Sequence, residues 1–268
     1  MYKSIFFLLS ISLLFWAGCK PAPVVDPVEG VVVGEAALTD LGLSLELIAP
    51  DSLFAGYQTI KAAIKDMDTD EMRSDLELTV IPMMTMTTMT HSVPIEQNAG
   101  SDTDGYYPFQ TVFIMPSGDM GYWELKVTVR DPLADREQTV MVPIEVVNPE
   151  EAKVRNFVAA DDSIPLFLSL VQPTEPTVGM NEFTLAVHKR ETMMNFPAVE
   201  GLTIEIEPTM PTMNHGSPNN VHPVYTAQGH YKGRVNFTMD GWWQVHVVVK
   251  RGETVVGETD FNLTFTDR

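Results

Sequence analysis

The amino-acid sequence predicts an all-β chain made of two tandem β-sandwich domains. Three observations support this fold class: segments in which apolar and polar residues alternate, an internal repeat that places the same residue types in both halves, and turn-forming residues where a helical protein would have long periodic stretches. The chain has 268 residues, enough for one or two domains, and 44% of them are hydrophobic, as expected for a protein that buries a core.

Residues 1–18 are expected to be a signal peptide. A basic start precedes an apolar run at residues 5–16, which is too short to span a bilayer, for which about 20 residues are needed. The run ends in Ala-Gly-Cys and resembles the lipobox of bacterial lipoproteins, although Trp16 stands where that family prefers Leu. The resemblance implies cleavage before Cys19 and a lipid on its sulfur. An ordinary secretory signal or an uncleaved anchor is the alternative.

Residues 19–40 are predicted to be a lipidated tether, because the segment contains three prolines and little polarity pattern. No other stretch of the sequence is apolar enough to cross a membrane. We therefore expect a protein of the cell envelope that is held to a membrane by its N-terminal lipid, at the outer membrane or in the periplasm rather than at the inner membrane. Cys19 is the only cysteine, so disulfides are excluded.

The remainder contains two copies of one domain, which we place at residues 41–149 and 164–268. The copies share residue types in register, at an offset of 124 residues over most of the repeat. The matching residues are Met86, Met89, His91, Tyr107, Met115, Gly121 and Trp123 in the first copy and Met210, Met213, His215, Tyr231, Met239, Gly241 and Trp243 in the second. A four-residue insertion in the first copy precedes the tryptophan, and a chance match would not keep register over so many residue types.

Each copy is predicted to form β-strands of an immunoglobulin-like sandwich, because several short alternating segments occur in about 100 residues. In the first copy they are 43–49, 76–81, 122–129 and 139–147; in the second they are 166–171, 183–189, 202–207, 230–238, 242–250 and 254–265. Trp123 and Trp243 lie early in alternating strands, which favours core packing over ligand contact.

Charge and motifs exclude several functions. Asp and Glu outnumber Lys and Arg by 36 to 17, giving a net charge of −19, which would repel a phosphate backbone and makes nucleic acid an unfavourable partner. The sequence contains none of the zinc-protease, nucleophile-elbow or phosphate-loop motifs, and no nucleophile, base and orienting residue can be assembled from it. We therefore expect a protein that is not an enzyme.

Methionine and histidine are the residues that can carry chemistry. Pro208 and Pro211 are expected to interrupt the strand, so that Met210, Met213 and His215 fall on an irregular loop. Thioether and imidazole suit Cu(I), and a thioether binds metal outside the cytoplasm without forming a disulfide. Met239, from a neighbouring strand, completes the predicted site.

His222 is a substitute ligand in the second domain. The first domain offers a weaker set, with Met86, Met89, His91 and Met115 at the matching positions. The alternative for both loops is packing, because methionine is a flexible gap-filler that folds over the ends of sandwiches.

The second copy is similar to the YtkA-like domain and its FixH relatives over about 50 residues. The residues concerned are the segment 208–215, the segment 229–233, Phe237, Met239 and the Gly-Trp-Trp that begins at Gly241; the first copy matches more loosely. The resemblance implies an extracytoplasmic immunoglobulin-like module, often tethered to a membrane and often associated with copper handling or oxidase assembly.

Two hypotheses follow. The first is a copper-binding module that buffers copper or delivers it to a copper-handling partner protein, with copper as the only cofactor. The second is a metal-free lipoprotein whose sandwiches serve as spacers or as surfaces for protein interaction.

Overall fold

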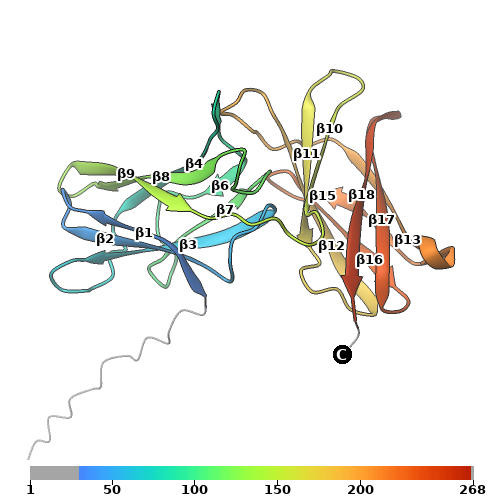
Figure 1. Cartoon of the computed structure of the whole chain (residues 1–268), viewed down its shortest axis with the longest axis horizontal. Helices are drawn as coiled ribbons and strands as arrows, with labels where there is room; N and C mark the ends of the chain where they lie inside the picture. The colour runs from blue at the N-terminus through green and yellow to red at the C-terminus, as the bar shows by residue number, and fades with distance from the viewer. Residues whose placement is uncertain (1–29, 267–268) are drawn as a thin grey trace, which may run out of the picture.

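The computed structural model describes residues 30–266 and confirms an all-β chain (Figure 1). Cys19, the signal peptide and the first part of the predicted tether lie outside the described residues. No helix in residues 30–266 is long and apolar enough to cross a membrane.

The first sandwich contains nine strands in two sheets. The strands are β1 (Val31–Leu38), β2 (Leu43–Ala49), β3 (Tyr57–Asp66), β4 (Glu77–Thr85), β5 (Thr90–His91), β6 (Ile95–Gln97), β7 (Tyr107–Val112), β8 (Tyr122–Asp131) and β9 (Arg136–Ile144). One sheet has the order β1-β2-β3-β7-β6 and the other the order β5-β4-β8-β9, with antiparallel pairing throughout.

The second sandwich repeats this topology. Its elements are β10 (Val154–Val158), β11 (Pro165–Gln172), β12 (Gly179–Lys189), β13 (Thr203–Met210), the 3-10 turn η1 (Pro211–Met213), β14 (His215–Gly216), β15 (Val221–Tyr225), β16 (His230–Phe237), β17 (Gly241–Arg251) and β18 (Thr254–Phe265). The sheet orders β10-β11-β12-β16-β15 and β14-β13-β17-β18 correspond strand by strand to those of the first sandwich. The two sheets of each domain match the two-sheet division of an immunoglobulin sandwich.

The cores confirm the role predicted for the tryptophans. Trp123 and Trp243 are fully buried, and each indole N–H donates to a main-chain carbonyl, that of Met115 or Met239, at 3.0 Å. Tyr107 and Tyr231 are likewise buried in equivalent positions, where each hydroxyl donates to a carbonyl and accepts a backbone N–H. The internal repeat is therefore also a repeat of buried contacts.

Two segments that the sequence analysis left outside the domains are strands. Residues 31–38, assigned to the tether, form β1 and pair with β2, and the joint before residue 164 contains β10, paired with β11. Both are poor in strict alternation because they lie at a sheet edge. Phe157 of β10 nevertheless packs on Gly257 so closely that a Cβ there would lie 2.1 Å from its ring, so β10 is part of the second sandwich.

The expectation that Pro208 and Pro211 interrupt the strand is wrong for Pro208. The strand does not stop before Pro208 but runs through it to Met210, with Pro208 opposite Val245 of β17. On the other side, β14 pairs only with Thr209 and Met210. A proline is tolerated where no neighbouring strand needs its missing N–H.

In one sheet of the second sandwich, β11 and the second half of β12 are buried on both faces. In β11 and β12, residues that should point outward, namely Phe167, Ser169, Thr184, Ala186 and His188, are almost inaccessible. A strand buried on both faces has a near-continuous apolar run instead of alternation, and residues 166–170 (LFLSL), which only Ser169 interrupts, show such a run. The first sandwich lies against this sheet, because β3 contacts β11 and residues of both domains line the pockets at the junction.

Candidate metal centre

Each sandwich carries the same short hairpin at one end. In the first, Met84 of β4 pairs with His91 of β5 and lies opposite Trp123. In the second, Met210 pairs with His215, and the preceding Thr209 lies opposite Gln244, the residue after Trp243. Met84 is therefore the structural counterpart of Met210. The constant-offset alignment, which matched Met86 with Met210, is wrong by two residues at this point, because the first hairpin has one more residue pair, Thr85–Thr90, before a loop of the same length.

The hairpin of the second domain separates its two methionines. Met210 ends β13 with 4% exposure and packs in the core, whereas Met213 lies on the turn η1 with 59% exposure. Met239 is half-buried against the core. His215 already has a partner, because its Nε2 is hydrogen-bonded to Thr238 Oγ1 at 2.9 Å. The predicted loop cluster thus consists of one core residue, one solvent-exposed residue and a histidine whose Nε2 is engaged.

His222 does not lie with this hairpin. Its Nδ1 accepts the backbone N–H of Ile206, in the middle of β13, at 3.0 Å. The surrounding pocket includes Glu205 and His246 and contains none of the predicted methionines. The structure gives His222 a main-chain partner instead of a place among the thioethers.

The first domain brings its predicted residues together. One pocket of about 370 Å³ is lined by all four of them, Met86, Met89, His91 and Met115. Its opposite wall belongs to the second domain and includes residues of β10 and β11 and the loop that follows β12. The additional pair Thr85–Thr90 places Met86 beyond the core position, which Met84 occupies, and Met86 is half-buried at the junction.

His91 is held in one orientation. The ring is 5% exposed, and its Nδ1 lies 2.8 Å from the carbonyl oxygen of Ser92, so Nδ1 carries the proton and donates it. The ring also meets Trp123 edge-on, with centroids 5.7 Å apart. In the neutral imidazole this leaves the lone pair on Nε2, and no residue between 30 and 266 hydrogen-bonds to that nitrogen. Histidines that bind metals commonly have their other nitrogen fixed in this way.

The donor set limits which metal the pocket suits. Among residues 30–266, no three His, Cys, Asp or Glu side chains form a group able to hold a metal ion. Thioethers must therefore supply most of the ligands, and one imidazole with several thioethers suits Cu(I) better than zinc, magnesium or calcium. Arg190 also lines the pocket, and its positive charge opposes a divalent cation more strongly than a monovalent one.

The sequence analysis missed the residues that join the domains beside this pocket. His230 Nε2 donates to Glu96 Oε1 at 2.9 Å, and the Tyr57 hydroxyl donates to Glu96 Oε2 at 3.3 Å. Burial first, and then the Glu96 carboxylate, raise the pKa of Tyr57. The backbone N–H of Ser92 donates to the carbonyl of Met193 at 2.8 Å. Each bond except that of Tyr57 crosses from one sandwich to the other.

His188 is buried at the same junction. It has 3% exposure, lies in a pocket of about 520 Å³ with Glu96, and its Nδ1 has no hydrogen-bond partner within the described chain. Burial lowers the pKa of His188 to about 4, with His230 acting in the same direction and Glu96 opposing it.

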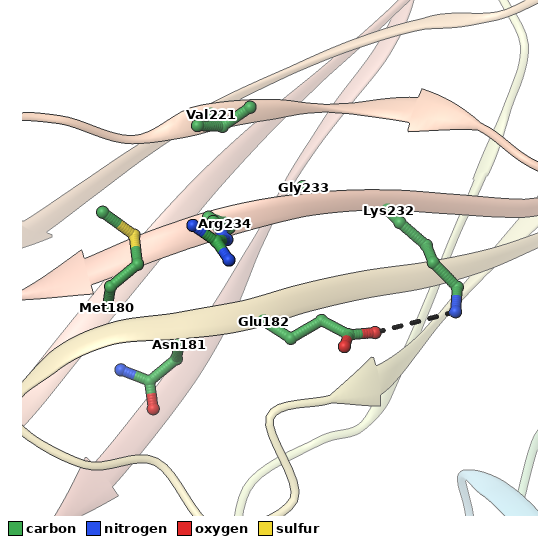
Figure 2. Close-up of a pocket in the computed structure, with 7 residues that line it drawn as sticks. All are labelled: Met180, Asn181, Glu182, Val221, Lys232, Gly233 and Arg234. Atoms are coloured by element: carbon green, nitrogen blue, oxygen red, sulfur yellow. Dashed lines mark ion pairs between the residues drawn. The ribbon is translucent and has the colours of Figure 1, made fainter.

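A separate groove lies on the exposed face of β12, β15 and β16 (Figure 2). Its volume is about 470 Å³, and Glu182 and Lys232 form an ion pair across it at 3.9 Å. None of the predicted metal ligands lies there. The groove is shallow and carries both signs of charge, so it does not resemble a soft-metal site.

Comparisons with known proteins assign part of the second domain. Residues 164–248 match the model of the YtkA-like family. No curated protein matches the chain.

Among solved structures, the chain is similar to invasin, a bacterial integrin-binding protein, at 14% identity over 84% of this chain and 39% of that chain, with a TM-score of 0.27. Domains 5–6 of the S-layer protein SbsC match at 13% identity over 80% of this chain and 92% of that chain, with a TM-score of 0.25. The present chain thus spans well under half of the invasin chain. These similarities are too low to indicate an activity or a partner.

Proposed function

We propose that this chain is a cell-envelope module that binds one Cu(I) in the pocket between its two sandwiches, through Met86, Met89, His91 and Met115. The observation that carries the proposal is the convergence of these four side chains on one pocket, with the imidazole of His91 fixed so that Nε2 bears the lone pair. The match of residues 164–248 to the YtkA-like family supports an extracytoplasmic location.

The chemistry of the donors supports Cu(I). A thioether carries no proton at neutral pH, so no proton has to leave when the metal binds, and it cannot be oxidised to a disulfide. The net charge of −19 favours the approach of cations to the surface.

The exposure of the ligands suits transfer as well as storage. His91 is buried and Met86 and Met115 are half-buried, whereas Met89 is 48% exposed at the hairpin tip. An exposed thioether is the ligand that a partner protein can most readily replace. We therefore propose buffering of copper and its delivery to a copper-handling partner.

A lipid on Cys19 would hold the module at a membrane surface. The Cys19→Ser variant should leave the membrane fraction or remain uncut, as judged by fractionation and by the mass of the protein. A fully processed, membrane-bound variant would mean that another feature provides the anchor.

Copper binding is tested by titrating the full chain, kept in solution with a mild detergent, with Cu(I) in competition with a chromophoric chelator. We expect one tight site that is lost in His91→Gln. The matched control is His215→Gln in the second hairpin, which should bind as the parent does. If the parent takes up no Cu(I), or if both variants behave alike, the proposal is wrong and the metal-free interaction module is the better description.

A further inference from the structure

We infer that Met193, which belongs to the second sandwich, is a fifth donor of this pocket, so that Cu(I) binding locks the two sandwiches together. This inference rests on the proposed function and adds a ligand that lies outside the repeated Met/His motif. Met193 lines the same pocket as Met86, Met89, His91 and Met115.

The backbone of Met193 is fixed beside His91. Its carbonyl accepts the N–H of Ser92, the residue that follows His91 and whose own carbonyl orients the His91 ring. Ser92 therefore links the two sides of the pocket: one of its main-chain groups holds the imidazole of the first domain and the other holds the methionine loop of the second.

The loop itself is built to present Met193. Residues 191–195 form a tight turn in which the Thr192 hydroxyl accepts the N–H of Met194 at 3.1 Å and the Asn195 amide donates to Glu191 at 3.0 Å. These bonds fix the loop without any contribution from the methionine side chains. The thioether of Met193 is not needed for these bonds.

The neighbouring methionine, Met194, lies in a different pocket. Met194 lines the other junction pocket, together with His188 and Glu96, and not the pocket that contains His91. Both side chains are partly exposed, Met193 at 37% and Met194 at 49%, so burial in a core explains neither of them. Only Met193 is placed with the other thioethers.

A site with ligands from both sandwiches couples metal binding to domain contact. Whatever free energy Met193 contributes to binding must also stabilise the closed junction, because ligand linkage is reciprocal. The Ser92 N–H lies on that junction, so its exchange with solvent reports junction opening directly.

The test compares Met193→Leu with Met194→Leu in the full chain. Leucine keeps the volume of methionine, so both variants should fold, which circular dichroism verifies. Met193→Leu should weaken Cu(I) binding at least about tenfold, since even residues that only support a metal ligand are worth about 10–100-fold in affinity. Met194→Leu should leave the affinity unchanged.

Hydrogen exchange provides a second readout. Cu(I) should slow exchange of the Ser92 amide at least about tenfold in the parent and in Met194→Leu, but not in Met193→Leu. If Met193→Leu binds Cu(I) as the parent does, while His91→Gln does not, Met193 is not a donor and the inference fails although the proposed function stands. If the parent does not bind Cu(I), both fail.

Discussion

The hairpin β4–β5 and the hairpin β13–β14 occupy the same position in two copies of one fold, yet their methionines have different surroundings. In the second domain the ladder ends at Met210, which is in the core, and Met213 is in solvent. In the first, two additional residues carry Met86 out of the core, and the second sandwich supplies the wall that closes a pocket around it. The difference indicates that a repeated Met/His motif forms a pocket only where a neighbouring domain packs against it.

Breaking the tryptophan beneath each hairpin should have the largest effect on stability. Trp123→Ala and Trp243→Ala each remove a fully buried ring that donates a hydrogen bond, and each should cost about 3–5 kcal/mol in the free energy of unfolding. Chemical denaturation followed by circular dichroism measures this cost. Only Trp123→Ala should also weaken Cu(I) binding, because Trp123 orients His91. Equal loss of Cu(I) binding in both variants would remove the distinction between the two hairpins.

The junction should make the second sandwich more sensitive to acid than the first. Ala62 pairs with Tyr107 as Leu185 pairs with the equivalent Tyr231, so the two domains can be aligned at this point. Three residues further on, the half-exposed Lys65 of the first domain stands where the second has His188. Because burial lowers the pKa of His188 to about 4, the unfolded chain binds a proton between pH 6.5 and 4 that the folded chain does not.

Stability should therefore fall as the pH decreases through this window, by an amount on the order of 3 kcal/mol. Denaturation of the parent and of His188→Leu at several pH values measures the difference, since the variant lacks this titration while Glu96 and His230 remain. Parallel pH profiles for the two proteins would contradict a lowered pKa of His188 in the folded chain.

Of the two glycines that face the hairpins, the one in the first domain should be the less tolerant of substitution. A Cβ on Gly121 would lie 2.3 Å from the carbonyl oxygen of Thr85, whereas a Cβ on Gly241 meets only the flexible end of Met210 at 2.9 Å. Both have positive φ, so Gly→Ala at either position costs about 1–3 kcal/mol in backbone strain. Gly121→Ala should cost more, and a smaller loss of thermal stability than in Gly241→Ala would contradict the packing described for the first hairpin.

Local sequence patterns were sufficient for the fold class. Alternation located β2 and β18 to the residue and most of the other predicted strands to within a few residues, because each of these strands has one face in a core. β3 and β7, which lie side by side within one sheet of the first sandwich, were not predicted. β1 and β10 were missed because edge strands with mixed burial alternate poorly, and β13 was ended too early because a proline was given more weight than the strand's free side allows.

The site depended on information that local patterns do not contain. The sequence contained every predicted methionine, but a constant offset cannot reveal that the first hairpin has one more residue pair. The second domain was ranked above the first because of its additional candidate histidines. Met193 reaches the pocket of His91, and His230 reaches Glu96, only because β11 and β12 of the second sandwich lie against the first. The one available signal was the largely apolar run at residues 166–170, interrupted only by Ser169, which indicates a strand buried on both faces.

The central claim is that the first hairpin, and not the second, binds the metal. The most direct test measures Cu(I) affinity for Met86→Leu/Met89→Leu and for Met210→Leu/Met213→Leu, in which each change costs about 1.5 kcal/mol of stability or less. Cu(I) affinity should fall at least about tenfold for each methionine replaced in the first variant and should be unchanged in the second. Loss of binding in the second variant with retention in the first would contradict the claim.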